Sequence, residues 1–236
     1  MTTDNGARAD RKTLGDHVLR LKLLAIAAAL VAVTGCAVGP PMADPASDAP
    51  EPGHAPPRPL ANDAASYAEA LQRWRTPEDV NAWIGARFEY SLPRAMLLSE
   101  TQRSRQGSLP IPPADEFFAA PKGVCVDLSR FAVDTLRRID SSTEPTFLLI
   151  EFAPVTIAGN TLRRHWLASF RRDGKLWFFA DSKRPGHIAG PYDTTQAFIA
   201  DYAAYRGRTI VGFRELATHQ RKLRTAATRQ ERDTRP

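Results

Sequence analysis

The stretch of sequence that decides the fold is residues 123–139, GVCVDLSRFAVDTLRRI. Its residues repeat at helical spacing at Leu128, Phe131, Ala132, Thr135, Leu136 and Ile139. This period predicts an amphipathic helix over residues 124–139 that buries one face. Gly123 precedes the helix, so Cys125 falls at its start.

Upstream of this helix the patterns are also helical. Residues 62–74 are rich in alanine, and Thr76 followed by Pro77 and two acidic residues is typical of a capped helix start. A further helix is predicted over residues 93–105, and a short helical turn over residues 115–120.

Downstream the period changes. Residues 146–152, 162–170, 176–180 and 209–213 are rich in β-branched, leucine and aromatic residues and predict strands, with a helix over residues 194–205. Helices first and antiparallel strands afterwards indicate an α+β domain.

The register of one hairpin decides whether His165 can meet Asp181. A two-residue turn at its Asp-Gly bend pairs Arg172 with Lys175 and puts His165 and Asp181 on opposite faces. A three-residue loop pairs Arg171 with Lys175, which places His165 opposite Asp181 with Cβ atoms about 5 Å apart. We expect the three-residue loop, because a type I turn followed by glycine suits this sequence.

That register also predicts how the helix packs. It places Leu167, Trp177 and Phe179 on the same face as His165. We therefore expect the long helix to cover this face, which would bring Cys125 to His165.

Cys125, His165 and Asp181 together suit nucleophilic catalysis. The free N–H groups and dipole of a helix start favour a thiolate and can hold an oxyanion. The thiolate needs a base, and the base needs an orienting acceptor. His165 and Asp181 are the candidates for these roles.

Structural alternatives stand beside each assignment. Cys125 could be a buried structural thiol, and His187 could be the base in place of His165. Asp127 has a structural role, either capping the helix or pairing with Arg130.

The N-terminus has the pattern of an export signal. A basic stretch precedes an apolar run at residues 23–33, which is too short to span a membrane. The following Thr-Gly-Cys36 resembles the lipobox of bacterial lipoproteins, whose cysteine carries lipid. Ala37 after it favours the outer membrane by resemblance to enteric sorting rules. The alternative is an ordinary signal peptide or an uncleaved anchor.

These patterns predict four segments: a signal peptide (1–35), a proline-rich tether (36–61), a folded domain (62–216) and a basic, loosely ordered tail (217–236). The protein is expected to be exported and anchored to a membrane through lipid on Cys36, facing the periplasm. Cys125 is then the only thiol left in the mature chain.

The net charge of +6 comes from dispersed residues, many of them in the leader and the tail. No nucleic-acid motif accompanies them, so we expect no nucleic-acid partner. The cysteine and histidine spacing gives no metal site, and no cofactor is expected.

The run from Pro113 through Cys125 to Asp127, followed by His165-Trp166 and then by Asp181 at the end of a strand, resembles the transglutaminase-like superfamily. It looks closest to the bacterial transglutaminase-like cysteine proteinases, and the resemblance covers about residues 78 to 185. It implies a papain-like fold with a Cys–His–Asp triad at Cys125, His165 and Asp181.

The resemblance also implies a second oxyanion donor upstream of the cysteine, for which Tyr90 is the best candidate. Val124 and Val126 replace the acidic residues that flank the cysteine in this branch. The calcium dependence of some relatives is therefore not expected.

The sequence thus predicts a lipid-anchored cysteine hydrolase or acyltransferase that acts on amide bonds of a protein or peptide in the cell envelope. The alternative is a non-catalytic binding or scaffold lipoprotein of the same fold. A third option is a basic protein that binds anionic polymers.

Overall fold

The computed structural model describes residues 47–51, 60, 62–107 and 109–219. These residues belong to one structural unit, Ala43–Pro236. The predicted signal peptide, the lipidation residue Cys36 and nearly all of the predicted tail lie outside the described residues.

The α+β class is confirmed, with helices first and an antiparallel sheet afterwards. The helices before the sheet are α2 (Tyr67–Arg73), α3 (Pro77–Arg87), α4 (Leu92–Leu97), α5 (Glu100–Gln106), α6 (Ala114–Ala119) and α7 (Cys125–Ile139). One more helix, α8 (Thr195–Arg206), lies between the last two strands of the sheet in chain order.

The main sheet has the strand order β6-β5-β4-β3-β7 and is antiparallel throughout. Its strands are β3 (Thr146–Ile157), β4 (Asn160–Arg172), β5 (Lys175–Phe179), β6 (Ala189–Tyr192) and β7 (Ile210–Leu216). A separate parallel pair joins β1 (Glu89–Tyr90) to β2 (Lys122–Gly123).

Local chemistry accounts for several helix boundaries. The Thr76 hydroxyl accepts from the Asp79 N–H, and the Asp79 carboxylate accepts from the Thr76 N–H, which forms a reciprocal cap at the start of α3. The helix predicted over residues 93–105 is in fact two helices, because Ser99 caps a second helix by accepting from the Gln102 N–H. Strand β6 was not predicted, since it is short and contains Gly190 and Pro191.

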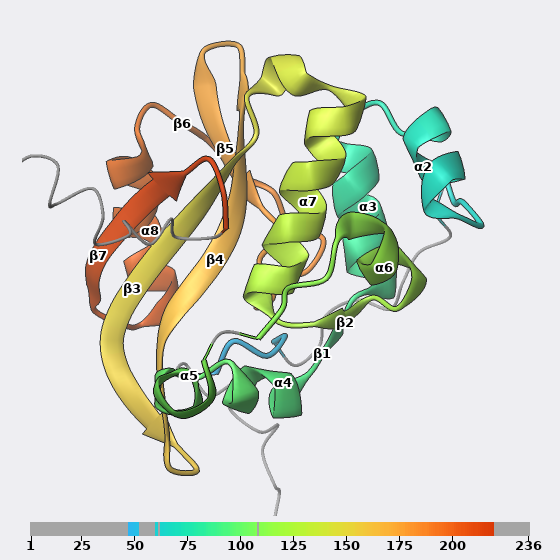
Figure 1. Ribbon diagram of the computed structural model, residues 1–236. Coiled ribbons are helices and arrows are strands. Elements are labelled where there is room, and N and C mark those ends of the chain that lie inside the picture. Colours follow the sequence, from blue (N-terminus) through green and yellow to red (C-terminus); the bar gives the residue numbers. More distant parts are fainter. Residues whose placement is uncertain (1–46, 52–59, 61, 108, 220–236) are drawn as a thin grey trace, which may run out of the picture. The chain divides into compact units, whose positions relative to one another are not determined.

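Helices cover both faces of the sheet (Figure 1). Helix α7 packs with Ala168, Phe170 and Phe179 in one hydrophobic cluster, while α8 packs with Leu167 and Phe178 in the other. The prediction that α7 covers the His165 face is therefore wrong. His165 shares its side of β4 with Leu167, the side that α8 covers, and it stacks on Tyr202 of α8 with ring centroids 5.9 Å apart.

The reason for that error is the hairpin register. Arg172 pairs with Lys175, so the β4–β5 connection is the two-residue turn and the predicted three-residue loop is wrong. Regular pairing would then place His165 and Asp181 on opposite faces. The strand does not continue regularly, however, because Ala180 has a left-handed backbone with a φ of 59° and β5 ends at Phe179. This reversal turns Asp181 towards His165.

The start of α7 is fixed by a buried carboxylate. Asp127 is fully buried and accepts two hydrogen bonds from Arg94 of α4, each 2.6 Å long. It also accepts from the Val124 N–H at 3.0 Å. The capping role predicted for Asp127 is confirmed, but its ionic partner is Arg94, and Arg130 pairs with Asp134 instead.

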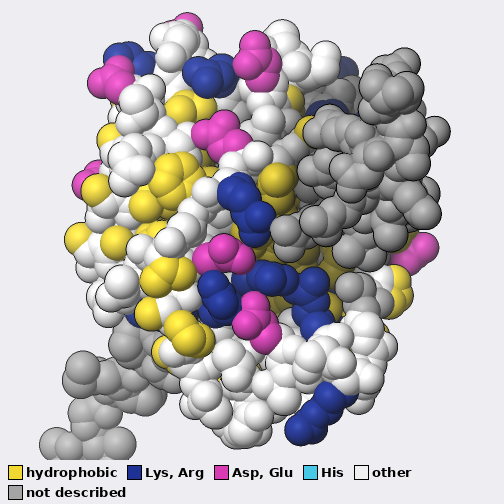
Figure 2. Space-filling model, turned by 60° about the vertical axis from the view of Figure 1, so that its left-hand side comes forward, with side chains coloured by type: hydrophobic (Ala, Val, Ile, Leu, Met, Phe, Trp, Pro, Cys, Tyr) yellow, Lys and Arg dark blue, Asp and Glu magenta, His cyan; other side chains and the backbone are white. Residues whose placement is uncertain are grey.

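The surface carries charges of both signs. Figure 2 shows a face on which Lys and Arg side chains gather beside Asp and Glu side chains. Glu100 and Glu151 both lie within ion-pair distance of Arg164, and Glu151 also pairs with Arg214. The positive charge of these residues is thus balanced locally. In the part of the chain that the structure describes, no helix has the length and apolarity needed to span a bilayer.

Replacing Asp127 should destabilise the protein strongly. Asp127→Ala removes the partner of Arg94 and the cap of α7 together, so we expect the free energy of unfolding in urea to fall by about 3 kcal/mol. Asp134→Ala, on the same helix but in a half-buried pair, should cost about 0.5 kcal/mol or less. Equal losses in the two variants would contradict the anchoring role of Asp127.

Candidate active site

Cys125 is the first residue of α7 and is 6% exposed. The parallel pair β1–β2 leads directly into it, because Tyr90 lies opposite Gly123 and the Ser91 N–H donates to the Gly123 carbonyl at 2.8 Å. A Cβ at Gly123 would lie 2.7 Å from a carboxylate oxygen of Asp127. The glycine therefore lets the strand approach the capped helix start.

His165 and Asp181 meet as the sequence predicted, although by another route. The Nε2 atom of His165 lies 3.1 Å from Oδ1 of Asp181, and both side chains are buried. Asp181 is held in turn by the Lys183 N–H at 2.9 Å and by the Tyr202 hydroxyl, which donates to Oδ2 at 3.0 Å. These bonds fix both the carboxylate and the plane of the ring.

The sulfur of Cys125 joins this pair. Its Sγ, a ring nitrogen of His165 and a carboxylate oxygen of Asp48 all lie within 4.8 Å of one another. Nε2 of His165 is occupied by Asp181, so Nδ1 is the nitrogen left for the sulfur. Within the described residues, Nδ1 is buried and makes no well-directed hydrogen bond.

Asp48 is the residue that sequence analysis missed. It belongs to residues 47–51, inside the proline-rich stretch predicted to be a tether. Its Oδ1 lies 3.2 Å from Nδ1 of His165 and 2.7 Å from Nη2 of Arg206. The contact with His165 is an ion pair, because the ring N–H is not directed at the carboxylate. The amino-acid composition of the predicted tether gave no indication that part of it contacts the site around Cys125.

The charged groups around the His165 ring shift its pKa. Burial lowers the pKa of His165, but Tyr202, Asp48, Cys125 and the hydrogen bond to Asp181 together raise it well above its ordinary value. The imidazole is therefore held in its charged form.

The carboxylates respond in the opposite direction. Burial raises the pKa of Asp181, but the hydrogen bond and charge of His165 and the charge of Arg206 outweigh it and lower the value to about 2. The pKa of Asp48 is also lowered, because His165 and Arg206 outweigh its burial. Each carboxylate thus stays ionised beside the charged ring.

Tyr90, the predicted oxyanion donor, lies close to the same charges. Burial raises the pKa of Tyr90, and the charges of Asp48 and Cys125 raise it further. The hydroxyl therefore keeps its proton and can donate it in a hydrogen bond.

The same three groups could in principle hold a metal, because thiolate, imidazole and carboxylate are all zinc ligands. The position of Arg206 argues against this use of the site. Its guanidinium contacts the same Asp48 oxygen that faces His165, at 2.7 Å, so a cation would have to share that oxygen with a fixed positive charge.

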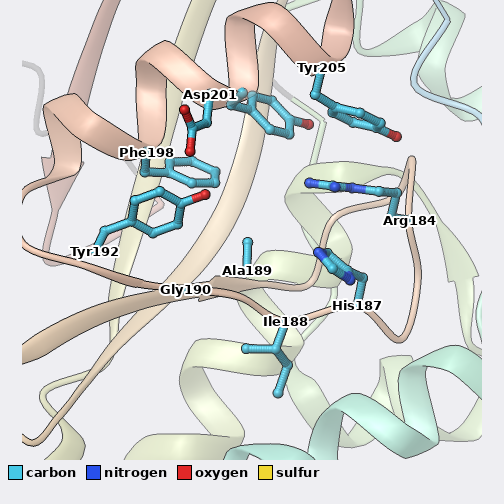
Figure 3. Close-up of a pocket in the computed structure, with 10 residues that line it drawn as sticks. Arg184, His187, Ile188, Ala189, Gly190, Tyr192, Phe198, Asp201 and Tyr205 are labelled. Carbon is cyan, nitrogen blue, oxygen red and sulfur yellow. The ribbon is translucent and has the colours of Figure 1, made fainter.

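An open pocket with an empty volume of about 540 Å³ lies between α8 and the segment around β6. Figure 3 shows Arg184 beside Tyr205 at one end and Tyr192 beside Phe198 at the other. His187, the alternative base, lines this pocket and is not in the group around Cys125. Arg184 connects the pocket to the site, since it lies 3.8 Å from the Tyr205 ring centroid and 3.6 Å from Asp181.

Comparison with known proteins gives no family assignment: no protein-family model matches the chain, and no curated protein matches it.

The pH dependence of stability should report the charge of His165. A folded-state pKa above the unfolded value means that the protonated ring stabilises the fold below about pH 6.5, and that this contribution is lost as pH rises through the folded-state pKa. Asp48→Asn removes one cause of the raised pKa. We therefore expect this variant to lose less unfolding free energy than the wild type between about pH 6 and pH 9 in urea titrations.

Asp115→Asn is the matched control, because Asp115 is an exposed acid on α6. It should lose as much stability over this range as the wild type. An equal loss in Asp48→Asn and in the wild type would mean that Asp48 does not charge the ring.

Proposed function

We propose that this protein is a cysteine hydrolase or acyltransferase that acts on amide bonds through Cys125, His165 and Asp181. The observation that carries the proposal is the approach of Cys125 Sγ to the imidazole of His165, whose other nitrogen lies 3.1 Å from Asp181. A thiol at a helix start, a base and an orienting carboxylate are the parts that acyl transfer through cysteine requires.

In this mechanism the Cys125 thiolate attacks the amide carbonyl and forms a tetrahedral intermediate. The charged His165 then donates its Nδ1 proton to the departing amine, which leaves a thioester on the sulfur. Asp181 keeps the ring oriented through Nε2. Water, activated by the neutral ring, releases a carboxylic acid and restores the thiol, whereas an amine in place of water completes a transamidation.

The oxyanion would be held by the backbone N–H groups at the start of α7 and by the Tyr90 hydroxyl. Tyr90 is supported as donor by its place opposite Gly123 in the β1–β2 pair and by its raised pKa. The implied architecture is papain-like, as in the transglutaminase-like superfamily, with the nucleophile at the start of a helix and the base on a strand.

One observation favours the non-catalytic alternative. A carboxylate oxygen of Asp48 lies within 4.8 Å of Sγ of Cys125, and Cys125 is almost fully buried. A protein in which this arrangement is permanent would be a binding or scaffold module of the same fold.

The proposed anchor is lipid on Cys36, which would place the domain at a membrane facing the periplasm, with an envelope protein or a cell-wall peptide as substrate. It is supported by the basic stretch, the short apolar run and the small residues before Cys36.

Acyl transfer can be tested with an activated ester. With p-nitrophenyl acetate, the full chain should release a burst of p-nitrophenol and carry an acetyl thioester on Cys125, detected by mass spectrometry. His165→Ala should slow acylation by at least about tenfold, because the thiolate loses its ion-pair partner. His187→Ala is the matched control and should acylate at the wild-type rate. If both histidine variants acylate alike, the site is not an acyl-transfer site and the non-catalytic alternative stands.

Lipid attachment is tested separately by labelling a bacterial host with radioactive palmitate. The full chain should incorporate label and sediment with membranes, and Cys36→Ser should lose both properties. Cys125→Ser should keep both, since this thiol is buried in the domain. Label on the Cys36→Ser chain would rule out Cys36 as the anchor.

A further inference from the structure

Residues 47–51 contact the site through both their backbone and their side chains. The Asp48 carboxylate contacts His165 and Arg206. The backbone carbonyl of Asp48 accepts a hydrogen bond from the Ser182 hydroxyl at 2.9 Å. Three residues later, the Glu51 N–H donates to the Lys183 carbonyl at 3.1 Å. The segment is thus held through its backbone as well as through its side chains.

Both acidic side chains of the segment have dedicated partners. Arg206 is completely buried, and its Nη1 donates to the Tyr202 hydroxyl at 3.0 Å while its Nη2 contacts Asp48. The Tyr205 hydroxyl donates to the Glu51 carboxylate at 2.6 Å. Tyr202, Tyr205 and Arg206 all belong to α8, so one face of this helix holds both acidic side chains.

The chemistry around Arg206 selects for a carboxylate. A buried guanidinium is costly unless an anion faces it, and its planar donors suit a carboxylate. The anion it meets here is supplied by a segment that lies 14 residues before Asn62, the first residue of the predicted domain. Nδ1 of His165 faces the same carboxylate, 3.2 Å from Oδ1 of Asp48, and is buried without a well-directed hydrogen bond in the described structure.

We propose that the surface that residues 47–51 cover beside Cys125 (the groove) binds acidic peptides, that Arg206 selects their carboxylate, and that residues 47–51 are its built-in occupant. The inference rests on the proposed acyl chemistry in treating Cys125 as the reactive group that the segment blocks. The Asp48 carboxylate lies against the ring nitrogen that must serve the sulfur, so the docked segment slows reaction at Cys125, and a free acidic peptide in the same place slows it as well.

A tethered segment competes strongly with a free one. A segment that is covalently joined to its own binding site has an effective concentration in the millimolar range, so a free peptide must be present at about millimolar concentration to compete. Weakening the segment by Asp48→Ala should open the groove and make a free peptide effective.

The test measures the rate of Cys125 alkylation by iodoacetamide in the full chain. Asp48→Ala should raise the rate by about tenfold over wild type, because the population with an open groove increases. Asp115→Ala, an exposed acid on α6, is the matched control and should alkylate at the wild-type rate.

Two synthetic peptides then decide the specificity. A peptide copying residues 46–52 should slow alkylation of the Asp48→Ala chain towards the wild-type rate, and the same peptide carrying Asp48→Asn should not. Adding Arg206→Gln to the Asp48→Ala chain should abolish protection by the first peptide. If that double variant fails to fold, as judged by circular dichroism, the comparison of the two peptides still decides the question.

The possible failures are distinct. If Asp48→Ala is alkylated at the wild-type rate, residues 47–51 do not block Cys125. If both peptides protect equally, the site does not select an acidic residue. In either case the proposed acyl chemistry stands if His165→Ala still slows alkylation. If His165→Ala changes nothing in either background, the proposed function itself is wrong.

Discussion

The ion pair between Asp127 and Arg94 is the constraint on which the site depends. Asp127 lies two residues after Cys125, and its carboxylate joins α4, the backbone before the helix and the first turn of α7. Because Gly123 leaves no room for a side chain at this point, the strand before the helix is pressed against the cap. The sulfur is thereby held in one place relative to the sheet, on which the histidine is carried.

Around that fixed sulfur, the site is organised by charge. The imidazole of His165 lies between two carboxylates, one on each ring nitrogen, and Arg206 balances the excess negative charge. Asp181 lies just after the end of β5, whereas Asp48 belongs to residues 47–51, which precede helix α2. An ionised thiol and Asp48 would repel each other at this distance. Docking of the segment and ionisation of the Cys125 thiol therefore disfavour each other.

Helical periodicity was sufficient to predict α7 and the place of Cys125, and the order of Cys125, His165 and Asp181 along the chain was sufficient to nominate the group. The hairpin register could not be predicted, because a two-residue and a three-residue turn both suit the same residues. The left-handed conformation of Ala180 is set by tertiary packing, since alanine has no local preference for it. That one residue restored the meeting of His165 and Asp181 that the observed register would have prevented.

Asp48 lay beyond the reach of pattern analysis for a different reason. A stretch rich in proline, alanine and aspartate buries little apolar surface, and its composition predicts a linker. Its contacts are polar and specific to one partner surface, so neither periodicity nor hydrophobicity could indicate them. Tyr90 was nominated only through the family resemblance. The β1–β2 pairing that places it opposite Gly123 involves only two residues in each strand, which is too short to give a strand pattern in the sequence.

The docked segment also sets how far the domain can travel from its proposed anchor. Asp48 follows Cys36 by only 12 positions, which allows a fully extended reach of about 40 Å. When the segment leaves this position, the first described residue that packs on the core becomes Leu60, and the reach grows to about 80 Å. Release of the segment would thus roughly double the distance that the domain can reach from the proposed anchor.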